Sequence, residues 1–298
     1  MTTDTSKVIV TDIDGTLLDY RTELPASAAQ AIVDARSAGH RAYVSTGRSL
    51  AELPKYILDL GFNGMILGNG SYIEHEGEVV HKECLPVAVA DRAIAWLESQ
   101  ELGFYIESND GLFGNEHLVP KTARMLASKE GYSDSVEENE EWLKTVMAPN
   151  LYDESVPHDN INKISFLLEP GVDLDDLARQ YAGEAAISTW NITGEGEEFG
   201  EFGQVGVNKG RGLRILANHL GKSLNDFVAL GDAAPDAPLL ETAGTGVAMG
   251  NAPEELKEIA DLVTDHVDDD GFAKALRQLG LTESEKSKGT SSEREEEI

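Results

Sequence analysis

The chain alternates between predicted strands and helices at both of its ends, and this alternation restricts the fold more than any other feature. Near the N-terminus, patterning predicts a strand at "VIV" from residue 8, a helix in "ASAAQAIVDARSAGH", a strand in "RAYVS" and a helix in "TGRSLAELPKYILDLG". The alternation returns late in the chain, in "NKGRGLRILANHLG", "DFVALGD", "APLLETAG", "GVAMGN" and "PEELKEIAD". This pattern is typical of a parallel sheet with helices on its faces. We therefore predict an α/β fold.

In the middle of the chain the predicted strands and helices no longer alternate regularly. Helices are predicted at 87–100, 120–130 and 173–182, and strands at 103–108, 162–168 and 185–193, with irregular acidic loops such as "EENEEW" between them. A glycine-rich segment, "GEGEEFGEFGQVG", is interpreted as a hairpin and hinge. We predict a discontinuous core at 1–83 and 196–281, an inserted α+β domain at 84–195, and a disordered acidic tail at 282–298.

Composition excludes several classes of partner. The chain has 298 residues, of which 54 are acidic and 24 basic, for a formal net charge of -30. Such a surface repels nucleic acid and anionic membranes, and it is what we expect of a cytosol kept at high salt. The single Cys84 fits a reducing compartment, and no apolar stretch reaches the roughly 20 residues of a membrane span. These features favour a cytoplasmic protein.

Polar residues follow three of the predicted strands. Asp12 and Asp14 follow the first strand, Thr46 follows "RAYVS", and Asp232 and Asp236 follow "FVALG". In an open parallel sheet, ligands bind beyond the carboxyl ends of the strands, so these groups are expected at one edge. Carboxylates at such an edge suit a divalent hard cation, Mg²⁺, and a phosphate. The seven histidines have no metal-ligand spacing, which argues against zinc.

The chemistry of these groups predicts their roles. Asp12 leaves the strand directly and is the better candidate for a nucleophile that forms an aspartyl-phosphate. Asp14 is the candidate general acid and then base. Lys209, which begins a predicted helix, is expected to stabilise phosphoryl oxygens together with the side chain of Thr46. The full candidate set is catalytic Asp12, Asp14, Thr46 and Lys209; phosphate-binding Ile13, Thr46, Gly47, Arg48, Lys209 and Asn251; and metal-binding Asp12, Asp14, Asp232 and Asp236.

Four segments resemble, in order, the motifs of the haloacid dehalogenase superfamily of phosphatases: "DIDGTLL", "STGR", "NKG" and "GDAAPDAPLL". "LGNGSYI", "GVAMGNAPEELKEIADLVT" and "DDDGFAKAL" resemble its Cof-like branch, which has a type IIB cap. The resemblance implies a Rossmann-like core, a cap that selects the substrate, Mg²⁺ dependence and hydrolysis of small phosphate monoesters such as sugar or cofactor phosphates. It also implies that the backbone carbonyl of Asp14 is a metal ligand.

One position departs from the family pattern. The fourth motif is usually Gly-Asp-x-x-Asn-Asp, but here Pro235 stands in the place of the asparagine. Proline offers neither a side-chain donor nor a backbone N–H at this position. Losing one positioned donor is expected to lower the rate by roughly 10²–10³-fold. Asn251 and Asn69 are the candidates to compensate.

Other interpretations stay open at this stage. Each motif taken alone has a structural explanation: a strand-end cap for Asp12, a turn at Asp14, a helix cap within "STGR" and a helix cap for Asp236. The functional alternatives are a phosphotransferase or mutase of the same superfamily and a phosphate-ester binder with weak or no activity, the latter because of Pro235. The sequence specifies neither the substrate nor the oligomeric state.

Overall fold

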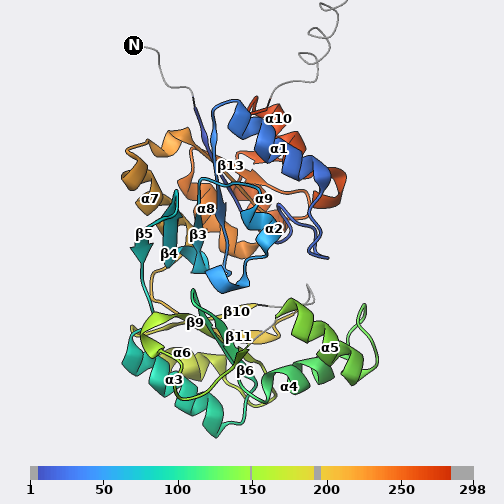
Figure 1. Ribbon diagram of the computed structural model, residues 1–298, viewed down its shortest axis with the longest axis vertical. Coiled ribbons are helices and arrows are strands. Elements are labelled where there is room, and N and C mark those ends of the chain that lie inside the picture. The colour runs from blue at the N-terminus through green and yellow to red at the C-terminus, as the bar shows by residue number, and fades with distance from the viewer. Residues whose placement is uncertain (1–5, 148–149, 191–195, 283–298) are drawn as a thin grey trace, which may run out of the picture. The chain divides into compact units, whose positions relative to one another are not determined.

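The computed structural model describes residues 6–147, 150–190 and 196–282, and the chain divides into two compact units (Figure 1). The first unit contains the described parts of Met1–Gly47, Pro54–His81 and Asn208–Ile298. The second contains the described parts of Arg48–Leu53 and Lys82–Val207. Within these described ranges, no helix combines the length and apolar character needed to cross a bilayer. The predicted tail after residue 282 lies outside the described residues.

The first unit is built on an eight-stranded sheet with the order β14-β13-β12-β1-β2-β3-β4-β5. The six strands from β14 to β3 run parallel, and β4 pairs antiparallel with β3. This confirms the predicted α/β class. The strands are β1 (Val8–Thr11), β2 (Arg41–Ser45), β3 (Gly64–Leu67), β4 (Tyr72–His75), β5 (Glu78–Lys82), β12 (Phe227–Gly231), β13 (Thr245–Ala248) and β14 (Leu262–Val263).

Helices cover this sheet. They are α1 (Ala26–Ser37), α2 (Lys55–Leu58), α7 (Lys209–Leu220), α8 (Ala237–Thr242), α9 (Glu254–Ile259) and α10 (Gly271–Gln278). Leu213, Leu239 and Leu256, from α7, α8 and α9, share one apolar cluster with Val8 and Val10 of β1. Figure 1 shows α1 and α10 side by side, and these two helices pack against each other. The central strand β1 is completely buried, which is typical of a sheet with helices on both faces.

The single helix predicted over 46–61 is wrong. The structure has a 3₁₀ turn at Leu50–Glu52 and then the short helix α2 at Lys55–Leu58. Pro54 separates them, because a proline ring disfavours helical backbone at the preceding residue and removes a backbone donor. Leu53 accordingly has an extended backbone, with ψ 122°.

The second unit is an α+β unit with a six-stranded sheet in the order β10-β11-β9-β6-β7-β8. Its apolar core is formed by buried side chains of the sheet, such as Phe104 and Phe166, and of α3 and α6, such as Leu97 and Leu177. The strands are β6 (Phe104–Ser108), β7 (Leu112–Gly114), β8 (Asn150–Leu151), β9 (Ile161–Leu167), β10 (Ala186–Trp190) and β11 (Phe199–Gly203); the helices are α3 (Val87–Ser99), α4 (Leu118–Leu126), α5 (Val136–Val146) and α6 (Leu174–Gln180).

The acidic segment "EENEEW" was expected to be an irregular loop, and that prediction is wrong. It lies inside α5. The hydroxyl of Ser135 accepts a hydrogen bond from the backbone N–H of Glu138, and acidic residues in the first turn interact favourably with the helix dipole. Leu143 is fully buried in a small cluster with Ala123 and Leu126 of α4, which gives the helix an apolar face despite its charge.

The glycine-rich segment near residue 200 forms a strand. Strand β11 pairs antiparallel with β9 on one side and β10 on the other, so it is internal to the sheet of the second unit. Phe202 is fully buried in the core of that unit. The second unit therefore continues to Val207, whereas the expected boundary is residue 195. The antiparallel pairing of β10 with β11 agrees with the predicted hairpin, whereas the segment expected to be a hinge is a strand inside the second unit.

Candidate active site

Parallel pairing brings the predicted site residues to one edge of the first sheet. Strand β1 lies between β12 and β2, and Thr11, its last residue, is in register with Leu230 and Val44. The backbone N–H of Asp12 continues the ladder by donating to the carbonyl of Leu230 at 3.0 Å. Asp12 and Asp232 therefore leave adjacent strands at the same end, as the sequence predicts.

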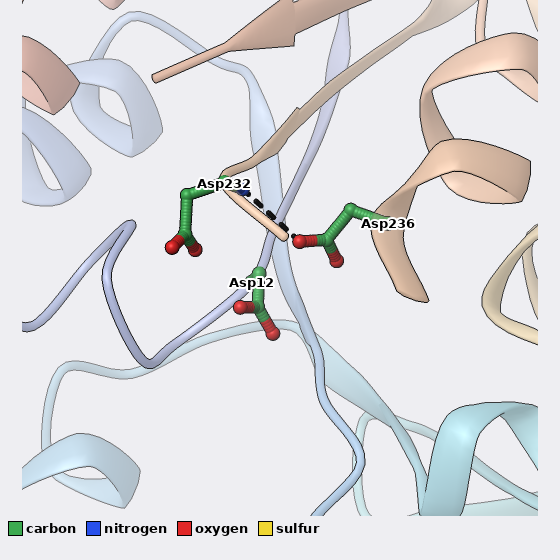
Figure 2. A group of neighbouring side chains, drawn as sticks. All are labelled: Asp12, Asp232 and Asp236. Carbon is green, nitrogen blue, oxygen red and sulfur yellow. Dashed lines mark hydrogen bonds between the residues drawn. The ribbon is translucent and has the colours of Figure 1, made fainter. Parts of the chain in front are cut away.

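Three carboxyl groups gather at this edge. Asp12, Asp232 and Asp236 are all buried, and each offers an oxygen within 4.8 Å of the others (Figure 2). Buried carboxylates repel one another unless a cation or a proton compensates them. Hard oxygen ligands are the set that Mg²⁺ prefers, so the residues present fit such an ion. Asp14 is half-buried just beyond β1, where it forms an isolated bridge with Leu18.

Lys209 supplies a positive charge to this cluster. It is the first residue of α7, and its Nζ lies 2.7 Å from Oδ1 of Asp12 and 2.6 Å from Oδ1 of Asp236. Burial opposes the charge of the ammonium group, but the two carboxylates outweigh burial and raise the pKa of Lys209. The lysine therefore stays protonated in contact with Asp12.

Asp12 and Asp236 have different surroundings. Burial, followed by the charge of Asp236, raises the pKa of Asp12 well above its ordinary value, and Lys209 opposes this rise. Asp236 is fully buried; its Oδ2 accepts from the backbone N–H groups of Asp232 and Ala233, both at 3.0 Å. Figure 2 marks the first of these bonds. With Oδ1 on Lys209, Asp236 uses both oxygens to hold the loop after β12 and the lysine.

Asp232 is surrounded by donors. Its Oδ1 accepts from the hydroxyl of Thr16 at 2.9 Å, and its Oδ2 accepts from the hydroxyl of Tyr20 at 2.7 Å and from Nδ2 of Asn251 at 3.3 Å. Burial raises the pKa of Asp232 to about 6, although the hydrogen bonds from Tyr20 and Thr16 act against this rise. Sequence reasoning gave Thr16 and Tyr20 no role. Thr16 at least belongs to a quoted motif, whereas nothing in the sequence distinguishes Tyr20.

Gly15 permits the close approach of Asp232 to the loop after β1. Its φ of +79° lies in the left-handed region, and a Cβ atom at this position would lie 2.2 Å from Oδ2 of Asp232. Any side chain there would displace the carboxylate.

The second predicted motif forms a loop against a neighbouring turn. Thr46 is buried; its backbone N–H donates to Ile66, and its carbonyl accepts from the N–H of Asn69. Asn69 has a positive φ of 56°, and its side-chain amide lies 3.3–3.5 Å from where a Cβ of Gly47 would be. Asn69, in the turn after β3, thus contacts both Thr46 and Gly47 of the motif.

The three remaining predicted phosphate-binding residues have different surroundings. Ile13 is fully buried, and its carbonyl accepts from the N–H groups of residues 16–18. Asn251 directs Nδ2 to the carbonyl of Gly15 at 2.8 Å as well as to Tyr20 and Asp232. Arg48 belongs to the second unit, where its guanidinium donates to the carbonyl of Glu52.

Pro235 is exposed and lies in the 3₁₀ turn Ala234–Asp236, directly before α8. The ring is well suited to this place, because its fixed φ favours the first turn of a helix. Of the two asparagines that could compensate for it, Asn251 already uses its amide on Gly15, Tyr20 and Asp232. Asn69 lies beside Gly47.

The second unit contains its own buried ion pairs. Lys163 lies 3.1 Å from Oε2 of Glu107 and 2.8 Å from Oε2 of Glu201, and Ser165 donates to Glu107 at 2.7 Å. These charges compensate one another within the sheet formed by β6, β9 and β11.

The fold and the site together define a class: an α/β protein with a parallel sheet and a cluster of buried carboxyl groups at the carboxyl edge of that sheet. The family model of haloacid dehalogenase-like hydrolases matches residues 9–276. The chain belongs to this family. This confirms the resemblance seen in the four motifs and the expectation of a hydrolase with a Rossmann-like core and an α+β cap.

Individual relatives extend over most of the chain. Phosphatase YwpJ of Bacillus subtilis is 28% identical over 92% of this chain and 99% of its own length. HMP-PP phosphatase of Escherichia fergusonii is 29% identical, over 83% of this chain and 85% of its own. The crystal structure of a hypothetical protein from Geobacillus kaustophilus HTA426 has a TM-score of 0.78 and 26% identity, covering 93% of this chain and 99% of that one.

Proposed function

We propose that the protein is a Mg²⁺-dependent phosphatase that hydrolyses a small phosphate monoester through an aspartyl-phosphate intermediate. The observation that carries this proposal is the contact between Asp12 and Lys209, at 2.7 Å, beside Asp232 at the carboxyl edge of the sheet. A nucleophile, a phosphate-binding cation and a metal-binding carboxylate are the parts that phosphoryl transfer requires.

Asp12 is the proposed nucleophile. Lys209 holds Oδ1, and within the described residues Oδ2 accepts no hydrogen bond, which leaves it available to attack phosphorus. A bond forms between Oδ2 and phosphorus as the bond between phosphorus and the leaving oxygen breaks. Mg²⁺, which Asp12, Asp232 and the carbonyl of Asp14 would hold, would reduce the repulsion between the carboxylate and the phosphate.

Asp14 is the proposed proton carrier. In the first step its carboxyl group gives a proton to the leaving oxygen, so that the alcohol departs neutral. In the second step the carboxylate takes a proton from water, the water oxygen bonds to phosphorus, and the bond to Oδ2 of Asp12 breaks. Inorganic phosphate leaves and Asp12 is restored.

Positive charge and donors hold the phosphoryl oxygens. Lys209, the hydroxyl of Thr46 and the backbone N–H groups of Ile13 and Gly47 are the proposed groups. Asp236 then positions Lys209, since it holds the ammonium group at 2.6 Å and anchors the loop after β12. We assign Asn251 to the support of Asp232 and of the loop at Gly15, because its amide already bonds to both.

The proposed substrates are sugar phosphates and cofactor phosphates. One relative is named for its action on HMP-PP. The excess of acidic over basic residues, 54 against 24, favours recognition of the phosphate by the metal and a few cations.

Phosphate release from a panel of sugar, nucleotide, flavin and pyridoxal phosphates tests the proposal. The assay contains Mg²⁺ and high KCl, with Asp12→Asn as the matched variant. We expect release that disappears in the variant and in EDTA. Release that persists in Asp12→Asn would refute the nucleophile, and turnover that requires an acceptor other than water would identify a phosphotransferase. Tight binding of esters without turnover would support a binding protein.

A further inference from the structure

Tyr20 combines an exposed ring with an inward hydroxyl group. The residue is 63% exposed, yet its hydroxyl lies 2.7 Å from Oδ2 of Asp232, which is itself only 2% exposed. A ring this exposed gains little from burial. The hydrogen bond to Asp232 is therefore the main interaction that places the Tyr20 side chain.

The donors around Asp232 occupy its two oxygens unequally. Each carboxylate oxygen has about two acceptor sites. Oδ2 receives Tyr20, at 2.7 Å, and Nδ2 of Asn251, at 3.3 Å; the same Nδ2 also donates to Gly15 and Tyr20. Oδ1 receives only Thr16, at 2.9 Å, among the described residues. One acceptor site on Oδ1 therefore stays open.

Asn251 connects Tyr20 to the rest of the first unit. Its Nδ2 lies 3.0 Å from the Tyr20 hydroxyl oxygen and 2.8 Å from the carbonyl of Gly15. Its Oδ1 accepts from the backbone N–H of Val267 at 3.0 Å. The hydroxyl of Tyr20 thus accepts from Asn251 and donates to Asp232, which fixes its direction.

We propose that Tyr20 is a positioning residue for the divalent cation. Together with Asn251 it occupies Oδ2 of Asp232, so that Oδ1, which receives only Thr16 among the described residues, is the oxygen presented to the metal. This inference rests on the metal site of the proposed function. Hydrogen-bonded partners of a metal ligand fix its orientation, and their loss typically lowers metal affinity by about 10–100-fold.

The test is direct binding of Mn²⁺ to metal-stripped protein, measured by calorimetry without substrate. Tyr20→Phe is expected to raise the Kd by about tenfold or more. Tyr152→Phe is the matched control, because Tyr152 is a partly exposed tyrosine of the second unit and is not part of the loop that carries Tyr20. The control is expected to keep the wild-type Kd. Melting of both metal-free variants is measured alongside, to separate affinity from folding.

Four results would overturn the inference. An unchanged Kd in Tyr20→Phe, or an equal loss in Tyr152→Phe, would show that the Tyr20 hydroxyl does not position the ligand. Tighter binding in Tyr20→Phe would show that the hydroxyl competes with the cation for Asp232. Wild-type protein that binds no Mn²⁺ would overturn this inference together with the proposed metal site, whereas the first three comparisons leave the proposed phosphatase intact.

Discussion

Lys209 Nζ lies 2.6 Å from Oδ1 of Asp236, a carboxyl group that is completely buried. The same nitrogen lies 2.7 Å from Asp12. One buried cation thus connects a carboxylate that anchors a loop to the proposed nucleophile. Removing one member of a buried charge pair is costly, because the other charge is left uncompensated.

Replacing Asp236 with Asn is expected to disorient Lys209 without emptying the site. Loss of one hydrogen bond to a charged group costs about 1.5–3 kcal/mol. If the lost hydrogen-bond free energy stabilises the transition state but not the bound substrate, kcat decreases by roughly 10–100-fold. Asp226→Asn is the control, since Asp226 accepts from the N–H of Ser223 in an exposed 3₁₀ turn. Equal kcat values in the two variants would contradict the role of Asp236.

Replacing Gly15 with Ala is expected to displace Asp232. The new Cβ would lie 2.2 Å from Oδ2 of that residue, and a misplaced catalytic group can cost about 10²-fold in rate. Gly39→Ala separates this clash from backbone strain, since Gly39 also has a positive φ, +90°, but no atom within 4 Å of the new Cβ. Gly39→Ala is expected to lose about 1–3 kcal/mol of stability and to retain kcat. Full activity in Gly15→Ala would refute the assigned position of Asp232.

Replacing Pro235 with Asn is expected to raise kcat at fixed Mg²⁺, by up to about 10²-fold, because it restores a donor at an exposed position beside the site. Steady-state kinetics on the best substrate provide the measurement. An unchanged or lower kcat would mean that the site is built around proline. In that case Asn69, beside Gly47, is the next donor to replace.

The metal-free protein is expected to lose stability as pH rises from about 4 to 7. Burial raises the pKa of Asp232 from 3.8 to about 6 and also raises the pKa of Asp12. The folded protein therefore holds more protons than the unfolded chain in this range, so its free energy of unfolding falls as pH passes through 6. Each pKa unit corresponds to about 1.4 kcal/mol, so Asp232 alone contributes on the order of 2–3 kcal/mol.

Thermal melting in EDTA and 1 M KCl measures this dependence, because the salt screens repulsion between surface acids. Asp232→Asn is expected to flatten the profile, and Mg²⁺ is expected to reverse the loss in the wild type by binding the ionised carboxylates. A wild-type profile that rises from pH 4 to 7, or that matches Asp232→Asn, would contradict the assigned burial.

The positions of the residues at the strand ends were predictable because they depend on only two facts. Parallel strands share one carboxyl edge, and residues that directly follow β1 and β12 have little freedom to lie elsewhere. Tyr20 was not predictable, because its hydroxyl reaches Asp232 only through the path of an exposed loop. The boundary near β11 was hidden for a related reason: its glycines suggested a hinge, while the burial of Phe202 depends on partners distant in the chain.

The most direct test of the central claim is to trap the phosphoryl group on Asp12. An Asp14→Asn variant is mixed with a ³²P-labelled ester that has a good leaving group, and the reaction is quenched in acid. The first step then needs no proton donor, whereas attack by water is slowed, so label is expected to accumulate on the protein to about one phosphoryl group per chain. The label is expected to vanish when Asp12 is also replaced by Asn. Turnover of the ester without protein-bound label, or label that persists without Asp12, would contradict the account.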